Sequence, residues 1–247
     1  YKEKTGIKTP LVTCITDISM HPEWTASQTD IYLAPTQEIK RHLMKEGTRA
    51  EDILVTGIPV RQQFLDADCR QKRERNRTRR VLIMGGGLGL MPDLKELLEK
   101  LHSMQGVESV VITGKNHKMY EEWVNRYEDV EVLGYTENIS RYMRGADLVI
   151  TKAGGITLFE ILHSQVPLFV IHPFLEQEMN NARYAAEKGF AKVIWGRRED
   201  YIPELEKLLS DEKMMEEMTG NVRRACKEMI EVSLDEAVGI MEERMTA

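Results

Sequence analysis

Short runs of apolar, mostly β-branched residues alternate along the chain with longer stretches whose apolar residues recur at helical spacing. Parallel strands need a crossover connection, usually a helix, so this alternation predicts a parallel sheet covered by helices. Beyond residue 79 the predicted strands are Arg80–Met84, Ser109–Thr113, Val130–Leu133, Leu148–Ile150, Leu168–Ile171 and Ala191–Ile194. Strands in this number, joined by helices, predict an α/β protein with a complete Rossmann-type domain.

Residues 1–65 carry the same alternation over a shorter length. The predicted strands are Leu11–Thr16, Ile31–Ala34 and Ile53–Thr56, and a helix is predicted over Gln37–Lys45. These strands make only part of a doubly wound domain, and the chain lacks an initiator methionine. We therefore expect residues 1–65 to be the C-terminal part of an N-terminal domain, residues 66–79 a linker, and residues 80–247 a second domain with terminal helices.

Helical spacing is clearest at three places in the second domain. Met91–Leu101 aligns its leucines on one face, and Thr157–His163 forms a shorter stripe. The stretch from Pro203 to Ala247 is charged and contains methionines at helical spacing. Methionine in this pattern favours adaptable core packing over a ligand site.

Composition excludes several classes of protein. A hydrophobic fraction of 42% over 247 residues supports one large core or two modest ones, which excludes disorder. Apolar runs fall far short of the roughly 20 residues that a membrane-spanning helix needs, and the opening residues lack a signal-peptide pattern. Cys14, Cys69 and Cys226 show no C-x-x-C spacing. We therefore expect a cytoplasmic setting without a disulfide framework or a zinc site.

The predicted linker is strongly basic, although the whole chain carries a net charge of −6. Residues 69–80 read CRQKRERNRTRR, in which Glu74 is the single acid. The strip Arg70–Arg80 is either a solvated linker or a surface for anionic lipid headgroups, which would tie the protein to a membrane face. Nucleic acid is the least favoured partner, because no aromatic residue is interleaved and the pI is about 5.7.

Two glycine-rich loops follow predicted strands and precede helices, where backbone amides and a helix dipole can hold a phosphate. The first is Met84–Gly89, which includes Gly86 and Gly87. A dinucleotide fingerprint does not fit, because Gly114 stands where a ribose-binding acid would close the second strand. The second loop contains Gly154 and Gly155.

The second loop is flanked by further candidate ligands. Lys152 precedes the glycines, Thr157 lies in the first turn of the helix, and Glu160 is placed to accept hydrogen bonds from a ribose diol. Together the two loops could grip a diphosphate from both sides. The alternative is a pair of ordinary strand-to-helix turns.

A third strand end runs into a helix that is rich in polar side chains. Gln177, Glu178 and Asn181 share one face by their spacing, which suits recognition of a sugar, although such residues are also common at solvent-facing helix starts. Near the other end of the chain, Asp17 and His21 lie just beyond a predicted strand and are candidates for the acceptor side. The histidines show no metal-ligand spacing, so we expect no metal.

Five segments together resemble glycosyltransferases of the two-domain GT-B fold. The segments are ITDISMHPEW (15–24), GIPVRQQF (57–64), MGGGLG (84–89), KAGGITLFE (152–160) and EQEMNNA (176–182). The resemblance is closest to processive diacylglycerol glucosyltransferases and monogalactosyldiacylglycerol synthases, and more distant to the peptidoglycan GlcNAc transferase MurG. It implies a GT-B fold with a complete C-terminal Rossmann-like domain and a partial N-terminal one.

The resemblance also assigns the donor-site residues. Gly86, Gly87, Gly154 and Gly155 would face the diphosphate of a UDP-sugar, and Glu160 would hold the ribose. Gln177, Glu178 and Asn181 would bind the sugar, and the Tyr135–Ile139 loop would lie near the uracil. Gly114, Lys152 and Thr157 belong to the same predicted site.

Two departures from the family pattern matter. Leu175-Glu176 replaces the usual Pro-Gly before the Gln-Glu pair, which bears on sugar identity. The Gly-His loop that follows the first strand in the family does not precede Leu11, so we expect the catalytic base in the missing opening segment of the N-terminal domain; within this sequence Asp17 and His21 are the candidates.

The implied reaction is inverting, metal-independent and cofactor-free transfer of glucose or galactose from UDP-glucose or UDP-galactose to diacylglycerol. Three alternatives remain: a MurG-like UDP-GlcNAc transferase, a UDP-binding module that is completed by a partner chain, and a UDP-GlcNAc 2-epimerase.

Overall fold

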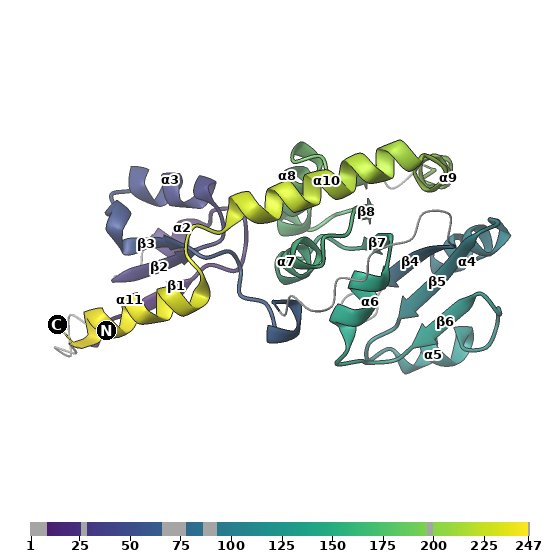
Figure 1. Ribbon diagram of the computed structural model, residues 1–247, viewed down its shortest axis with the longest axis horizontal. Helices are drawn as coiled ribbons and strands as arrows, with labels where there is room; N and C mark the ends of the chain where they lie inside the picture. The colour runs from purple at the N-terminus through teal and green to yellow at the C-terminus, as the bar shows by residue number, and fades with distance from the viewer. Residues whose placement is uncertain (1–8, 26–28, 66–77, 86–92, 197–199, 247) are drawn as a thin grey trace.

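The computed structural model describes residues 9–25, 29–65, 78–85, 93–196 and 200–246, and these contain two parallel sheets. The first sheet has the order β1-β2-β3 and the second the order β6-β5-β4-β7-β8-β9. Figure 1 shows the sheets at opposite ends of an elongated molecule, with α10 running alongside the second sheet toward the first. The predicted α/β architecture is therefore present in both parts of the chain.

The first sheet is built from short strands. Its elements are β1 (Val12–Cys14), α2 (Pro22–Thr25), β2 (Ile31–Ala34), α3 (Gln37–Lys45), η1 (Ala50–Asp52), β3 (Ile53–Val55) and η2 (Gln62–Phe64). The bounds of β2 and α3 are those predicted, and β1 and β3 are shorter. Thr36 caps α3, because its side-chain oxygen accepts a hydrogen bond from the amide of Ile39.

The second sheet carries a helix after nearly every strand. Its elements are β4 (Arg79–Met84), α4 (Leu94–Ser103), β5 (Val107–Ile112), α5 (His117–Trp123), β6 (Val130–Leu133), α6 (Ile139–Gly145), β7 (Leu148–Thr151), α7 (Gly155–Ser164), β8 (Leu168–Ile171), α8 (Glu176–Glu187) and β9 (Ala191–Ile194). Each predicted strand is present within two residues of its expected bounds. The order reverses between β4 and β7, and in such sheets ligands bind beyond the carboxyl ends of the strands at this point.

Helices cover both faces of the second sheet. One core packs α6, α7, α8 and part of α10 against the sheet and also contains Ile58 and Phe64 from the end of the first domain. The opposite core buries Leu94, Leu97 and Leu101 of α4 as predicted. The buried methionines of α10 confirm the prediction of packing. The junction between the domains is thus part of the core under α7.

The last helices, α9 (Ile202–Ser210), α10 (Glu212–Met229) and α11 (Leu234–Thr246), lead back to the first sheet. Alternate residues of β2 face opposite sides, so that Tyr32 packs toward α3 and Leu33 toward Ala237 of α11. Figure 1 shows α11 beside the first sheet. The predicted division places residues 80–247 in one domain, and no sequence pattern indicates that α11 packs against the first sheet.

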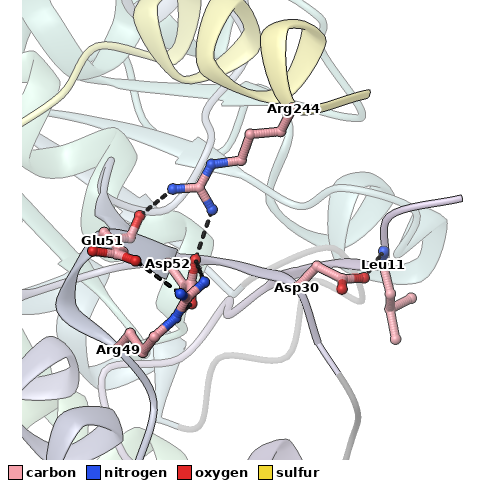
Figure 2. A network of polar contacts seen from close by, with 6 residues as sticks. All are labelled: Leu11, Asp30, Arg49, Glu51, Asp52 and Arg244. Atoms are coloured by element: carbon pink, nitrogen blue, oxygen red, sulfur yellow. Dashed lines mark hydrogen bonds and ion pairs between the residues drawn. The ribbon is translucent and has the colours of Figure 1, made fainter. Parts of the chain in front are cut away.

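Polar contacts hold the end of α11 in place (Figure 2). The guanidinium of Arg244 pairs with Asp52 at 2.7 Å and donates to the carbonyl of Glu51 at 2.5 Å. Arg49 also contacts Asp52, at 2.8 Å. Burial opposes ionisation of Asp52, but the hydrogen bonds from Arg49 and Arg244 outweigh it and lower its pKa.

Candidate functional site

Two helices begin at the carboxyl ends of adjacent central strands without a side-chain cap. Helix α7 follows Gly154, and α8 follows Leu175; within the described part of the chain neither residue accepts a hydrogen bond with its side chain from the helix it precedes. Uncapped first-turn amides and the helix dipole favour an anionic ligand. Gly86 and Gly87 of the first predicted loop lie outside the described residues.

Gly155, at the start of α7, lies against the first domain. A Cβ atom at this position would lie 2.5 Å from the carbonyl oxygen of Thr16 and 3.4 Å from Ile58. Only glycine allows this approach, because the oxygen belongs to the backbone of the loop that follows β1. The glycine that was predicted to face a diphosphate therefore also brings the first domain to the edge of the crevice.

A cavity of about 530 Å³ lies between the loop after β1 and the start of α8. Its lining residues are Asp17, Ser19, Met20, His21 and Trp24 from the first domain and Leu175, Glu176, Gln177 and Asn180 from the second. The volume lies in the range of small-molecule sites. The structure thus brings the predicted acceptor-side residues Asp17 and His21 to the same cavity as the predicted sugar ligand Gln177.

The loop that carries Asp17 is locally ordered. Asp17 is 7% exposed, and its Oδ1 accepts hydrogen bonds from the amide and the hydroxyl of Ser19. The hydroxyl of Tyr32 donates to the carbonyl of Trp24 at 2.8 Å, which ties the other end of the loop to β2. The catalytic role of Asp17 and His21 stays a prediction.

Glu160 lies one turn into α7 and is 7% exposed. Its carboxylate pairs with the Nη2 atom of Arg61 at 3.0 Å. Burial raises the pKa of Glu160, and the hydrogen bond and charge of Arg61 oppose the shift. Sequence reasoning missed Arg61, although it lies in the quoted segment GIPVRQQF; a basic residue two positions after Gly-Ile-Pro was the available signal.

The polar residues of α8 divide between two environments. Gln177 is exposed at the cavity, whereas Glu178 is 9% exposed and Asn181 is 1% exposed. The amide of Asn181 donates to the carbonyl of Ala153 at 2.7 Å, and a carboxylate oxygen of Glu178 accepts from the amide of Phe174 at 3.5 Å. Glu178 and Asn181 therefore support the loops before α8 and α7, and in the described part of the chain Asn181 Oδ1 has no partner.

Replacing Asn181 with alanine should lower the free energy of unfolding by about 1–3 kcal/mol, because the carbonyl of Ala153 would lose its buried donor. The affinity for UDP, the predicted ligand, should fall as well, since the loop before α7 would lose its support. Urea denaturation and calorimetric titration measure the two effects. Asn180→Ala, a change in the neighbouring residue that lines the cavity, serves as the matched control for stability. Equal unfolding free energies for both variants would contradict the supporting role.

The other predicted donor-site residues that the structure describes do not line the cavity of about 530 Å³. Lys152 Nζ lies 5.4 Å from the ring centre of Phe174, so it spans the loops before α7 and α8. Thr157 is half-buried in the first turn of α7, and Gly114 is buried at the end of β5 with a φ of +58°. Tyr135 is 66% exposed, whereas the side chain of Ile139 is in the core. Only the backbone of Ile139 would therefore be available to the predicted uracil.

The basic strip is described only at its end, because residues 66–77 lie outside the described residues. Arg79 pairs with Glu212 at 2.5 Å, and Arg80 pairs with Glu108 at 2.7 Å. Both arginines belong to β4 and are engaged within the second domain. A lipid-facing role of the strip would therefore rest on Arg70–Arg77.

Comparison with known proteins shows which family has a sequence similar to this chain. Residues 80–233 match the glycosyltransferase family 28 C-terminal domain, and residues 1–60 match monogalactosyldiacylglycerol (MGDG) synthase. The chain belongs to glycosyltransferase family 28. The resemblance to glycosyltransferases of this kind is thereby confirmed.

Curated relatives of this family 28 chain include two processive diacylglycerol beta-glucosyltransferases. The protein from Bacillus licheniformis is 34% identical over 236 residues, which cover 90% of this chain and 60% of the relative. The protein from Bacillus subtilis is 33% identical over 232 residues, with the same two coverages. The chain thus spans about 60% of the length of these relatives.

Solved structures agree on the fold. MurG from Acinetobacter baumannii has a TM-score of 0.69 at 15% identity and covers all of this chain and 70% of its own. The Streptomyces glycosyltransferase SsfS6 has a TM-score of 0.63 at 17% identity, covering 98% and 64%. The predicted GT-B fold class is confirmed.

The described residues contain neither a cluster of metal ligands nor a helix that could span a membrane. Among them no group of three or more histidine, cysteine, aspartate or glutamate side chains could hold a metal ion. No helix within the described ranges is long and apolar enough to cross a membrane.

Proposed function

We propose that this chain binds a UDP-hexose in the crevice between its two sheets and takes part in the transfer of the hexose to diacylglycerol. The observation that carries the proposal is the buried carboxylate of Glu160, one turn beyond the uncapped start of α7 at Gly154–Gly155. A carboxylate accepts hydrogen bonds from a ribose diol, and the helix start attracts the diphosphate. The named relatives, which are beta-glucosyltransferases acting on diacylglycerol, support glucose over galactose.

The main barrier to such a transfer is the negative charge that develops on the leaving diphosphate. The amides at the start of α7, the helix dipole and the ammonium of Lys152 would stabilise that charge without a metal or a cofactor. One preorganised donor of this kind is worth about 3–4 kcal/mol in a transition state. With the nucleophile approaching from the opposite side, the anomeric configuration would be inverted.

The acceptor hydroxyl needs a general base, and the cavity offers Asp17 and His21. Exposed apolar side chains near the starts of α7 and α8 support an acceptor with acyl chains: Ile156, Phe174 and Leu175 are each half exposed. Leu175 and Glu176 line the cavity at the position where the sequence departs from the family pattern. These two residues are the candidates for setting the identity of the sugar.

The test is calorimetric titration of the chain with UDP, UDP-glucose, UDP-galactose and UDP-GlcNAc. We expect UDP to bind and UDP-glucose to bind more tightly than the other two sugar nucleotides. A preference for UDP-GlcNAc would favour the MurG-like reading, and turnover of UDP-GlcNAc without an acceptor would favour the epimerase. A folded chain that binds none of these nucleotides would contradict the proposal.

We further propose that Arg70–Arg77 attract the protein to anionic lipid headgroups. Replacing Arg73, Arg75 and Arg77 with glutamine should weaken binding to phosphatidylglycerol vesicles by about 1 kcal/mol per residue. Arg41→Gln, at an exposed residue of α3 that pairs with Glu38, is the control with one charge removed elsewhere. Vesicle sedimentation at low and high salt measures the effect. If the triple variant sediments like the wild type, the strip is only a linker.

A further inference from the structure

His172 combines two features that are each unfavourable for a folded chain. It directly follows β8 and has a φ of +49°, and its ring nitrogen Nε2 is enclosed without a hydrogen-bond partner in the described part of the chain. A left-handed backbone is strained for a residue with a side chain, and the following Pro173 further restricts the residue before it. Such strain is typical of ligand sites, and an unpaired buried polar atom requires an explanation.

Helix termination does not explain the strain at this position. Among the described residues, four other than glycine have a positive φ, namely Asp93, Asn125, Gln165 and His172. Asn125 and Gln165 follow α5 and α7, where a left-handed residue is an ordinary way to end a helix. Asp93 instead precedes α4, and His172 lies in the loop before α8. The two unexplained residues therefore lie beyond the carboxyl ends of strands, where ligands bind in such sheets.

Contacts connect His172 with the surroundings of both glycine-rich loops. In the loop that begins at His172, the ring centre of Phe174 lies 5.4 Å from Nζ of Lys152, just before the second glycine-rich loop. The ring of His172 meets the ring of Tyr201 edge-on, with 6.1 Å between the ring centres. The hydroxyl of Tyr201 donates to the carbonyl of Asp93 at 3.4 Å, beyond the first glycine-rich loop. His172 thus lies in the region where a diphosphate is predicted.

The enclosure of Nε2 determines which ring nitrogen carries the proton. A neutral imidazole has one donor nitrogen and one acceptor nitrogen. A proton on Nε2 would be a buried donor without an acceptor among the described residues, and unpaired buried donors are tolerated less than unpaired acceptors. We therefore assign the proton to Nδ1. His172 is half-buried and Nδ1 is not an enclosed atom, so the accessible edge of the ring carries an N–H donor.

We propose that His172 is a further ligand-binding residue of the crevice, and that its Nδ1–H donates a hydrogen bond to an anionic oxygen of the diphosphate. The inference rests on the proposed function, because it takes a UDP-sugar as the ligand. Tyr201 is a positioning residue: it is 4% exposed, packs in the core that contains Leu94 of α4, and supports the imidazole from behind. The backbone amide of His172 donates to the carbonyl of Ile194 at 2.9 Å, which keeps the strained residue in place.

The experiment measures the affinity of the full chain for UDP, UDP-glucose and inorganic pyrophosphate by calorimetry. For His172→Ala we expect all three affinities to fall about tenfold, because a hydrogen bond to a charged group is lost. His172→Asn should keep most of the affinity, since its amide nitrogen takes the place of Nδ1 and asparagine tolerates a left-handed backbone. His172→Gln, whose amide reaches toward the position of Nε2, should bind as weakly as the alanine variant.

His172→Gly separates the backbone strain from the imidazole. Glycine adopts a φ of +49° without a steric penalty, so this variant should be more stable in urea than His172→Ala and yet bind pyrophosphate as weakly. Gln165→Gly and Gln165→Ala are the matched controls, at the left-handed residue that ends α7. They should show the same difference in stability, and both should keep the wild-type affinities.

Three outcomes would overturn the inference and leave the proposed function intact. The first is wild-type affinity for UDP and pyrophosphate in His172→Ala. The second is recovery of affinity in His172→Gly, because the residue would then act through its backbone alone. The third is a loss confined to UDP-glucose, which would place the imidazole at the hexose. A folded wild-type chain that binds neither UDP nor pyrophosphate would overturn the proposed function and this inference together. Should His172→Ala not fold, the glycine and asparagine variants decide between these outcomes.

Discussion

Alanine in place of Gly155 is expected to lower the free energy of unfolding by about 1–3 kcal/mol and to weaken UDP binding. The added Cβ would lie 2.5 Å from the carbonyl oxygen of Thr16. A backbone oxygen cannot rotate away as a flexible side chain can, so the loop that carries Asp17 and His21 would have to move from α7. The same variant would therefore disturb the cavity that these residues line.

Gly220→Ala is the matched control, because a Cβ at this position of α10 would meet nothing within 4 Å. In an open helical position alanine is favoured over glycine by about 1 kcal/mol, so the control should be slightly stabilised. Urea denaturation gives the two free energies, and titration with UDP gives the affinities. Opposite signs for the two alanine variants are expected. A Gly155→Ala variant as stable as the control would mean that the domains do not meet as described.

Replacing Glu160 with glutamine is expected to abolish most of the UDP affinity while sparing the fold. Hydrogen bonds to a charged group are worth about 1.5–3 kcal/mol, which corresponds to a loss of roughly 10- to 100-fold in affinity. Glutamine has nearly the same shape and retains an oxygen that can accept from Arg61. Glu38→Gln, at an exposed residue of α3, is the control and should leave both quantities unchanged.

The pH dependence of stability provides an independent check on Glu160. Because burial raises its pKa in the folded state, the folded chain holds this proton more tightly than the unfolded chain. Ionisation of Glu160 therefore lowers the free energy of unfolding as pH rises from its ordinary value of 4.5 through the raised folded value. Glu160→Gln lacks this ionisation, so its stability relative to wild type should increase as the pH rises above 4.5. A difference that stays constant would contradict the assigned shift.

The local sequence pattern was sufficient to predict the helices and strands that are bounded by clear turn signals. The bounds of β2, α3, β6, β8 and β9 are those expected, since each run ends at a change in composition. The face of α4 that is buried also follows from leucine spacing alone. The carboxyl ends of β4, β7 and β8 could therefore be recognised as the position of a crevice.

Contacts between distant segments could not be predicted in this way. Arg61 and Glu160 are separated by 99 positions, and no periodicity links them. Helical spacing predicted one shared face for Gln177, Glu178 and Asn181, but spacing does not say which of these side chains meet solvent and which are buried. On α8 both Glu178 and Asn181 are buried, and of the three only Gln177 lines the cavity. The packing of α11 against the first sheet could not be predicted either, because it also joins segments that are distant in the sequence.

The two passages of the chain between the sheets lie against each other. Residues after β3 lead to the second domain, and residues after α10 lead back, with the amides of Glu231 and Val232 both donating to the carbonyl of Val55. Two bodies joined at neighbouring points keep one easy degree of freedom, a rotation about the line through the joints. We therefore expect the two domains to rotate more readily than they slide past each other. A ligand enclosed by such a rotation meets both walls in register, which reduces the entropy cost of aligning donor and acceptor.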